Sequence, residues 1–512
     1  MQRKWWTLLV VCVATFMLLL DITIVNVALP SIQRSLHASF QDLQWVVDAY
    51  ALTLAALLLT AGSLADLLGR RRVFIVGLGL FTLASLLCGL STEPLMLNVA
   101  RALQGVGGAV MFACSLALLA EEFRGRERGT AYGAWGAAIA GAAAVGPLVG
   151  GGLTEGLGWE YIFFINVPVG VAAIVLARLR LGESSDPEAT SVDWAGLMTF
   201  SASLFLLVLA LIRGNAEGWG SALILAELAA AGALSVVFLV AEVRQRRPMF
   251  DLSLFRKPTF AGASLVAFAV SASMFAMFLY ITLYLQNVLH YSALETGVRF
   301  LPVTVVSFVT APVAGRLAAR LPPRWFLGGG IGLVALGLLL MHGVGAHSSW
   351  TVLLPGLLVA GAGIGIVNPT LAQLAIGVVR PARSGMASGI NNTCRQVGIA
   401  TGIAGLGAIF QHRVQAKATD LISGTPAAKA LGRAGANLGQ QLSSGADPSA
   451  LKGMSPQVKA QLVEAGRQGF ASGLNEILIV ASIVAAVGAV LGFTLVRRRD
   501  LAEGAAEIAG AA

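Results

Sequence analysis

Long apolar segments recur along almost the whole of this 512-residue chain. Hydrophobic residues make up 56% of the sequence and charged residues only 12%, whereas an ordinary soluble domain carries about 25% charged residues. An apolar run of about 20 residues can cross a membrane as a helix, in which the backbone satisfies its own hydrogen bonds. The sequence therefore predicts an all-α polytopic membrane protein with fourteen spans, at 6–29, 43–65, 73–91, 95–120, 130–154, 161–178, 194–213, 219–241, 259–285, 297–318, 325–343, 351–378, 386–410 and 474–496.

Basic residues fall in short clusters between these segments. The net charge is +9, and a strongly basic chain can indicate nucleic-acid binding. Here the positive charges instead occupy alternate loops, as at Arg70–Arg72, Arg178, Arg180 and Arg497–Arg499, while the intervening loops carry few. Because cytoplasmic loops hold the excess of Lys and Arg, we predict a protein of the cell (inner) membrane, with both termini in the cytoplasm and no nucleic-acid partner.

Polar, basic stretches separate the seventh and eighth spans from the six spans on either side. Transporters are commonly built from two halves related by repetition. We predict three parts: an N-terminal six-helix bundle at 1–180, a two-helix linker insert at 181–250 and a C-terminal six-helix bundle at 251–512. The last part would include an outside loop at 411–473. The Gly, Ala, Ser and Gln content of this loop predicts mobility, and Asp447-Pro448 predicts the start of a short amphipathic helix at about 448–468.

Three ionisable residues, Asp21, Asp48 and Arg101, lie within predicted spans. An ionisable residue inside a membrane marks a functional site by default, because its charge is costly there. All three lie roughly 7–12 Å below the outer boundary, so they can share one layer. A carboxylate beside a cation ionises and a desolvated one protonates, and proton/substrate coupling requires this competition. The alternatives are structural hydrogen bonds for each Asp and a snorkelling position for Arg101.

The segment from Gly62 to Arg72 reads GSLADLLGRRR. It resembles the signature Gly-x-x-x-Asp-(Arg/Lys)-x-Gly-(Arg/Lys)-(Arg/Lys) of the major facilitator superfamily, although Leu67 stands where a cation is usual. The resemblance implies a cytoplasmic gating latch, with its acceptor near Ser384 and Gly385, made by Gly62, Asp66, Gly69, Arg70 and Arg71. The alternative is a positive-inside loop whose Asp caps a helix or pairs with an arginine.

Two further segments resemble this superfamily. In the fourth span, Arg101 and Gln104 precede the small residues Gly105, Gly107, Gly108 and Ala109, and the resemblance implies that this arginine takes part in proton coupling. The fifth span contains a run that resembles the motif of antiporters, Gly146-Pro147-Leu148-Val149-Gly150-Gly151. The proline favours a kink and the glycines allow close helix approach, so gating and ordinary small-residue packing are both open.

Residues 20–30, 45–50 and 159–168 resemble the 14-span drug:proton antiporters of the superfamily, although Glu160 stands where arginine is frequent. This resemblance covers nearly the whole chain. It implies the major facilitator fold, with two six-helix bundles and two extra helices between them.

Other polar and aromatic residues of the spans form a possible substrate pocket: Asn26, Gln104, Glu227, Tyr280, Tyr284, Asn391, Asn392 and Arg395. Aromatic and methionine side chains adapt to varied ligands. Several of these residues also have an interpretation that involves no substrate. Glu227 could make an interhelical hydrogen bond or be an exposed, protonated acid. The tyrosines could belong to a core or lipid-facing stripe, and the polar residues of the thirteenth span could serve packing or gating.

We predict a proton-coupled antiporter that exports amphipathic or cationic drugs and acts as a monomer. The alternatives are a dedicated exporter or a proton-coupled importer of a single metabolite. A non-transporting membrane sensor would not need the membrane carboxylates. The sequence contains no nucleophile–base or metal cluster and no phosphate-binding loop, so we expect no enzymatic activity, metal or cofactor. The proton gradient would supply the energy.

Overall fold

The computed structural model describes residues 2–38, 40–123, 126–185, 194–245, 250, 252–317, 321–379, 384–423, 425, 455–497 and 500. Helices account for nearly all of this part of the chain, which contains no β-strand. Among the described residues, 11 helices are long and apolar enough to cross a membrane, or up to 12 if a bent pair is one span. Each of the fourteen predicted ranges overlaps a helix or a series of consecutive helices. The all-α membrane class is confirmed, and the count of fourteen spans stays a prediction.

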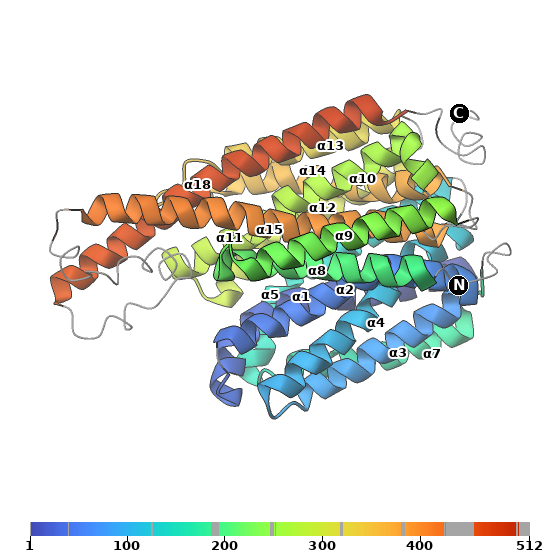
Figure 1. Cartoon of the computed structure of the whole chain (residues 1–512), viewed down its shortest axis with the longest axis horizontal. Helices are drawn as coiled ribbons and strands as arrows, with labels where there is room; N and C mark the ends of the chain where they lie inside the picture. Colours follow the sequence, from blue (N-terminus) through green and yellow to red (C-terminus); the bar gives the residue numbers. More distant parts are fainter. Residues whose placement is uncertain are drawn as a thin grey trace.

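The N-terminal helices lie side by side along the long axis of the molecule (Figure 1). They are α1 (Arg3–Leu36), α2 (Phe40–Leu68), α3 (Arg70–Gly89), α4 (Pro94–Glu122), α5 (Arg126–Gly156), α6 (Tyr161–Phe164) and α7 (Asn166–Arg180). The helix is interrupted at Ile165, between α6 and α7, because Pro168 has no N–H to donate to the Phe164 carbonyl.

The C-terminal helices are α10 (Pro258–Val270), η2 (Ser271–Phe275), α11 (Ala276–Leu283), η3 (Tyr284–Val288), α12 (Ala293–Leu317), α13 (Pro323–Leu340), η4 (Trp350–Val352), α14 (Leu354–Gly377), α15 (Ser384–Ile422) and α18 (Pro456–Leu495), and the short η1 (Leu252–Arg256) precedes them. Two π-helical turns, η2 and η3, flank α11 and widen the predicted ninth span. Such turns are frequent at functional sites.

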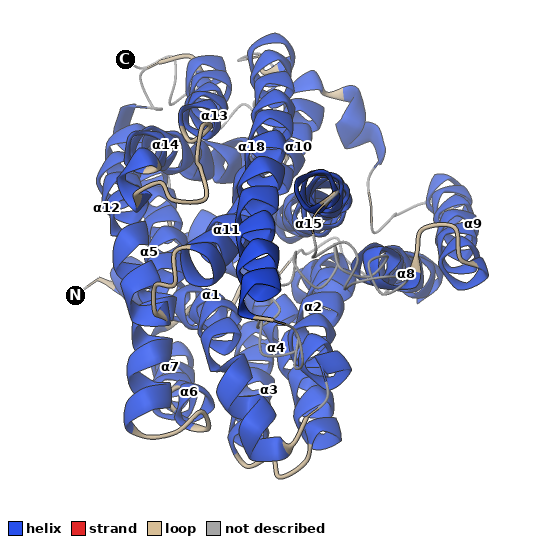
Figure 2. Cartoon of the chain, turned by 90° about the vertical axis from the view of Figure 1, so that its left-hand side faces the viewer, coloured by secondary structure: helices blue, strands red, loops and turns tan. Residues whose placement is uncertain are grey.

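The pair α8 (Trp194–Glu217) and α9 (Ala222–Arg244) lies beside the bundle, with α9 outermost (Figure 2). Helix α8 packs on α2 and α15, where Leu204 and Val208 contact Leu52 and Ala55 of α2. The predicted order of six, two and six helices fits this arrangement. The domain boundaries themselves stay a prediction.

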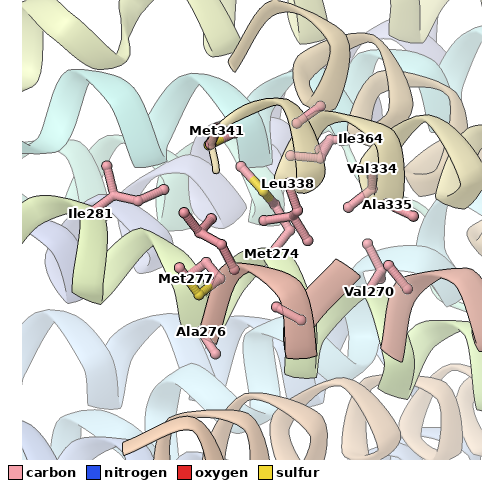
Figure 3. Close-up of a cluster of buried hydrophobic side chains, with 14 of the residues drawn as sticks. Val270, Met274, Ala276, Met277, Ile281, Val334, Ala335, Leu338, Met341 and Ile364 are labelled. Carbon is pink, nitrogen blue, oxygen red and sulfur yellow. The ribbon is translucent and has the colours of Figure 1, made fainter. Parts of the chain in front are cut away.

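Each half has its own hydrophobic core. In the N-terminal half, Phe81 and Trp135 are almost fully buried among side chains of α1 to α5. In the C-terminal half, Met274 and Met277 lie among apolar side chains of α13 and α14 (Figure 3). Ala372 of α14 packs into the N-terminal core, so α14 is a place where the two halves meet.

The predicted outside loop at 411–473 is wrong at both ends, where the structure is helical. Helix α15 continues to Ile422 and α18 begins at Pro456, and both run past the ends of the other helices (Figure 1). The helix predicted at about 448–468 is confirmed over 456–468, but it does not end there. Residues 448–454 lie outside the described part, and residues from Pro456 onward belong to one helix that continues into the last span.

Packing between the two long helices explains this extension. Buried side chains recur every four residues along α15, at Leu406, Phe410, Val414, Ala418 and Ile422. Side chains at this spacing share one helix face, and α18 covers it with Phe470 and Leu474. The Ser455 side chain accepts a hydrogen bond from the Val458 N–H and caps α18. The prediction of a loop at 411–473 rested on amino-acid composition, and composition does not record the four-residue spacing of these apolar side chains.

Candidate functional site

A buried ion pair joins α1 to α4. Arg101 Nη1 donates a hydrogen bond to Asp21 Oδ2, and both side chains are 1% exposed. Gln104 donates from Nε2 to Asp21 Oδ1 at 2.9 Å and accepts from Arg101 Nη1 at 2.8 Å. Arg101 Nε donates to the Val46 carbonyl of α2 at 2.9 Å. Arg101 therefore does not snorkel to the surface, and the ion pair has the additional hydrogen bonds that a buried pair needs.

Asn166 extends this network to α7 and α3. Its Nδ2 lies 3.1 Å from Asp21 Oδ1 and 3.0 Å from the Ser85 hydroxyl, which donates to the Phe163 carbonyl at 2.9 Å. Sequence reasoning missed both Asn166 and Ser85. The available signal was an amide side chain at the start of an apolar segment, two residues before Pro168, where a polar group needs a buried partner.

Glycines of α4 let the helix approach its neighbours. A Cβ on Gly105 would meet the Tyr50 carbonyl oxygen at 2.5 Å, and a Cβ on Gly107 would lie 2.5 Å from Phe81 N. The close approach to α2 also places the ring centroid of Tyr50 at 4.2 Å from Arg101 Cζ, within the range of a cation–π contact. The small residues at 105–109 therefore position the network.

The network contains one acidic and one basic group, both almost fully buried. Arg101 does not release its proton, so the Asp21 carboxylate is the member that can accept one. Protonation would replace the anion by a neutral acid and leave Arg101 without its counter-ion. Protonation of Asp21 would therefore weaken the contact that Arg101 makes between α4 and α1.

The structure does not bring Asp48 to this pair. Asp48 has no hydrogen-bond or ion-pair partner among the described residues. It lies two residues before Tyr50, and positions two apart in a helix do not face the same way. It shares a helix face with Trp45 and Leu52, which pack against α8 and α15. The structure thus groups Asp21 with Arg101 and places Asp48 on the opposite side of α2.

The predicted latch segment joins the two halves at the end of the bundle that carries the chain termini (Figure 1). Asp66 Oδ1 accepts from Arg70 Nε at 2.9 Å and Nη2 at 2.8 Å, while Asp66 Oδ2 accepts from the Met386 N–H at 3.0 Å. Met386 lies in the first turn of α15, two residues beyond Ser384. A carboxylate is stabilised there by the N–H groups of the helix end. Asp66 thus makes both contacts that the sequence allowed, one to an arginine and one to a helix terminus.

The other latch residues shape this corner. Gly69 has φ 103°, a backbone conformation that glycine adopts without the penalty of a side chain. Gly62 is buried within α2. The Arg71 N–H donates to Glu183 Oε1 at 3.0 Å and its Nη1 donates to the Leu181 carbonyl at 3.2 Å. Arg71 therefore anchors the segment that follows α7.

The glycine motif of α5 packs against α1 next to Asp21. A Cβ on Gly146 would collide with Thr23 Oγ1, and a Cβ on Gly150 would lie 3.2 Å from Ile24 Cα. Gly151 instead faces α12, in the other half. The motif therefore links the helix that carries Asp21 to the contact between the halves. Pro147 lies in the same helix, but its side chain is outside the described part.

Polar residues of α15 form a second buried group, in the C-terminal half. Arg395 Nη1 donates to Asn368 Oδ1 of α14 at 3.1 Å, and Asn392 Nδ2 donates to the Ser388 hydroxyl at 3.4 Å. Asn391 and Asn392 are 2% and 0% exposed. Within the described ranges, Asn368 Nδ2, Asn391 Nδ2 and Asn392 Oδ1 are buried without a hydrogen-bond partner. Asn368 was not predicted.

The two tyrosines belong to the C-terminal core. The Tyr280 hydroxyl donates to the Ile403 carbonyl and the Tyr284 hydroxyl donates to the Gly345 carbonyl, each at 2.7 Å. These contacts hold α11 and η3 against α15 and against the loop after α13.

Glu227 lies in the peripheral helix pair. Its Oε1 accepts from Arg213 Nη1 of α8 at 3.0 Å, so this contact is within the insert. Asn26 lies in α1, and its side chain is outside the described part. No group of three His, Cys, Asp or Glu residues in the described ranges could hold a metal ion.

Comparisons with known proteins agree with this architecture. The sequence profile of the Major Facilitator Superfamily matches residues 11–403. The multidrug resistance protein Stp of Mycobacterium tuberculosis is 36% identical over 405 residues, covering 79% of this chain and 75% of that protein. The tetracenomycin C resistance and export protein of Streptomyces glaucescens is 37% identical over 419 residues, covering 80% of this chain and 77% of that protein. The solved structure of the proton:xylose symporter XylE matches with a TM-score of 0.62 at 13% identity and covers 96% of both chains, which supports the fold alone.

Proposed function

The chain belongs to the Major Facilitator Superfamily, and we propose that it is a proton-coupled antiporter that exports amphipathic small molecules across the cell membrane. The buried Asp21–Arg101 pair carries this proposal, because it is an ion pair inside the bundle whose acid can exchange a proton. The names of relatives at 36–37% identity, a multidrug resistance protein and a resistance and export protein, support export of drug-like compounds.

The proposed cycle uses the ion pair as a switch. In the outward-facing state Asp21 takes a proton and the substrate leaves; in the inward-facing state Asp21 gives up the proton and substrate enters. Arg101 keeps its charge throughout, so it attracts the ionised carboxylate and loses that contact when the carboxyl is neutral. Gln104 and Asn166 hold the carboxylate in either state, because an amide can donate to an acceptor oxygen. The proposed cycle assigns no step to Asp48, which lies on the opposite side of α2 from this pair.

The contact between the halves supports a gating role for Asp66. If the termini are cytoplasmic, as the basic loops predict, the Asp66–Met386 hydrogen bond closes the inner side of the bundle. The α5 motif packs against α1 at Gly146 and faces α12 at Gly151, so it would transmit movement of the helix that carries Asp21 to the contact between α5 and α12. We propose that the protein works as a monomer, with protons and the exported compound as its ligands.

A dedicated exporter of one compound is the second candidate. It is favoured by the relative that is named for resistance to a single compound, tetracenomycin C, and for its export. The two candidates share the same coupling site and differ only in the breadth of the substrate pocket.

The test uses purified protein in liposomes, with an imposed pH gradient and a panel of amphipathic dyes. Wild-type protein is expected to drive dye against its gradient, and Asp21→Asn is expected to abolish the pH dependence while facilitated exchange of dye remains. Asp420→Asn is the matched control, because Asp420 is an exposed carboxylate on the protruding part of α15. Wild-type dye movement that ignores the pH gradient, or unchanged coupling in Asp21→Asn, would contradict the proposal.

A further inference from the structure

Arg395 is a buried arginine for which the described part of the chain provides no counter-ion. The residue lies about three turns from the start of α15 and is 7% exposed. The acceptor that the described residues offer to its guanidinium is the neutral Asn368 Oδ1, at 3.1 Å, and no carboxylate lies within ion-pair distance. A guanidinium keeps its positive charge, and a buried charge without an opposite charge is costly. An anion is therefore expected at Arg395 in at least one state of the protein.

Two amide groups near Arg395, one bonded to it and one a turn away on α15, have buried donors without an acceptor among the described residues. The Oδ1 atom of Asn368 faces Arg395, which leaves its Nδ2 group as a buried donor without an acceptor. Asn391 Nδ2, one turn before Arg395 on α15, is also buried without an acceptor. Native proteins pair nearly all buried polar groups. Two amide donors and a guanidinium with no matching anion form a site suited to an oxygen anion.

The location of this group fits a substrate site. Asn368 lies at the contact between halves, since its Cβ is 3.4 Å from the position of a Cβ on Gly136 of α5. Ala372, one turn further along α14, is part of the N-terminal core. Transporters built from paired halves bind their substrates near the middle of the membrane, at the interface of the halves.

Aromatic rings extend from Arg395 along the C-terminal half. Arg395 Cζ lies 5.7 Å from the ring centroid of Phe275 in the π-turn η2. Phe275 and Phe278 contact edge to face, and Phe278 contacts Phe300 of α12 in the same way. The Phe275 and Phe278 rings are only partly buried, so they can stack with the flat, apolar part of a ligand.

We propose that Arg395, Asn368 and Asn391 form a subsite for the anionic oxygen of an aromatic substrate, such as a phenolate or a carboxylate on a ring system. This inference rests on the proposed export function and specifies its substrate class. It differs from the sequence-based expectation of cationic drugs. The anion pairs with the guanidinium and accepts from the two amides, and the rings of Phe275 and Phe278 contact its aromatic part.

Asp48 is the intramembrane acid that could instead neutralise Arg395 in another state of the protein. In this structure Asp48 lies on the face of α2 with Trp45 and Leu52, and no ion pair joins it to Arg395. The experiment separates the two possibilities.

The test measures binding to the full-length protein in nanodiscs, with two dyes that share a xanthene ring. Fluorescein is an anion at mildly alkaline pH, and rhodamine 6G is a cation. Binding does not depend on proton coupling, so this readout is separate from the liposome test of the antiport. The variants are Arg395→Gln, Arg395→Lys, Asp48→Asn and the control Arg413→Gln, which alters an exposed arginine of the same helix.

Wild-type protein is expected to bind fluorescein more tightly than rhodamine 6G. Arg395→Gln should raise the Kd for fluorescein by about 10- to 100-fold, the usual effect of losing a charged hydrogen-bond partner, and leave rhodamine 6G binding unchanged or tighter. Arg395→Lys should recover part of the affinity, while Asp48→Asn and Arg413→Gln should leave the preference intact. Three outcomes would overturn the proposal: tighter wild-type binding of the cation, equal losses for both dyes in Arg395→Gln, or fluorescein binding that requires Asp48.

Discussion

The two halves of the molecule surround their buried arginines differently. In the N-terminal half, Arg101 has a carboxylate, an amide and a backbone carbonyl as acceptors, all from the protein. In the C-terminal half, Arg395 has one neutral amide. A charge that the protein itself neutralises is suited to internal switching, because breaking the pair changes the protein. A charge that the protein leaves without a partner is suited to a ligand that arrives from outside.

The largest expected difference in the free energy of unfolding is between the same substitution, arginine to glutamine, made in each of the two halves. Arg101→Gln leaves Asp21 buried without its cation, so we expect the free energy of unfolding to fall by about 3–5 kcal/mol. Arg395→Gln removes a charge that has no counter-ion, so its effect should be near zero or stabilising. Reversible unfolding in mixed micelles measures both. Equal losses in the two variants would remove the distinction between the halves.

The next effect tests how tightly the N-terminal site is held. Gly146→Ala places a methyl group against Thr23 of α1, and overpacking of this kind costs about 1–3 kcal/mol. It should also weaken proton-driven transport, because α1 carries Asp21. Gly152→Ala in the same helix is the control, since a Cβ there meets nothing within 4 Å. If both variants unfold alike, close α1–α5 packing does not position the site.

A smaller effect is expected from making the C-terminal half resemble the N-terminal half. Asn368→Asp would give Arg395 a carboxylate at the position of its present amide acceptor. Charge-assisted hydrogen bonds are about twice as strong as neutral ones, so we expect a gain of about 1 kcal/mol in the free energy of unfolding. Fluorescein binding should weaken together with this gain, because the new carboxylate occupies the anion site. Unchanged fluorescein affinity would show that the dye does not contact Arg395.

The smallest effect on the free energy of unfolding is expected for Arg413, an exposed arginine of α15. It serves as the reference for the buried arginines. Arg413 pairs with Glu476 of α18 at 3.0 Å, and its side chain is 52% exposed. Exposed ion pairs contribute about 0–1 kcal/mol, so Arg413→Gln should change the free energy of unfolding by less than the other variants. Added salt should make the variant and the wild type still more alike. A loss comparable to that of Arg101→Gln would mean that the protruding helices contribute to the stability of the bundle.

Much of the fold follows from composition and periodicity along the chain. Apolar runs of about 20 residues must become helices in a membrane, so each predicted range overlaps a helix or consecutive helices of the structure. The ion pair between Asp66 and Arg70 was predictable from their separation of four residues, and it bridges the end of α2 and the start of α3. The gating role of this segment stays a prediction. The outer parts of α15 and α18 were missed because two helices stabilise each other there across a long separation in sequence.

Hydropathy and charge along the chain already required that certain buried residues have partners, and the packing of the helices selected those partners. Asp21 and Arg101 were costly wherever they lay, because charge in hydrocarbon is costly in every fold. Whether Asp21 or Asp48 met Arg101 depended on which face of each helix turned inward. That choice came from the packing of α1, α2 and α4, including the close approach at Gly105. The tertiary structure also recruited Asn166 and Ser85 to Asp21 and left Arg395 with one neutral acceptor. Such contacts join residues far apart in the sequence, so local periodicity contains no record of them.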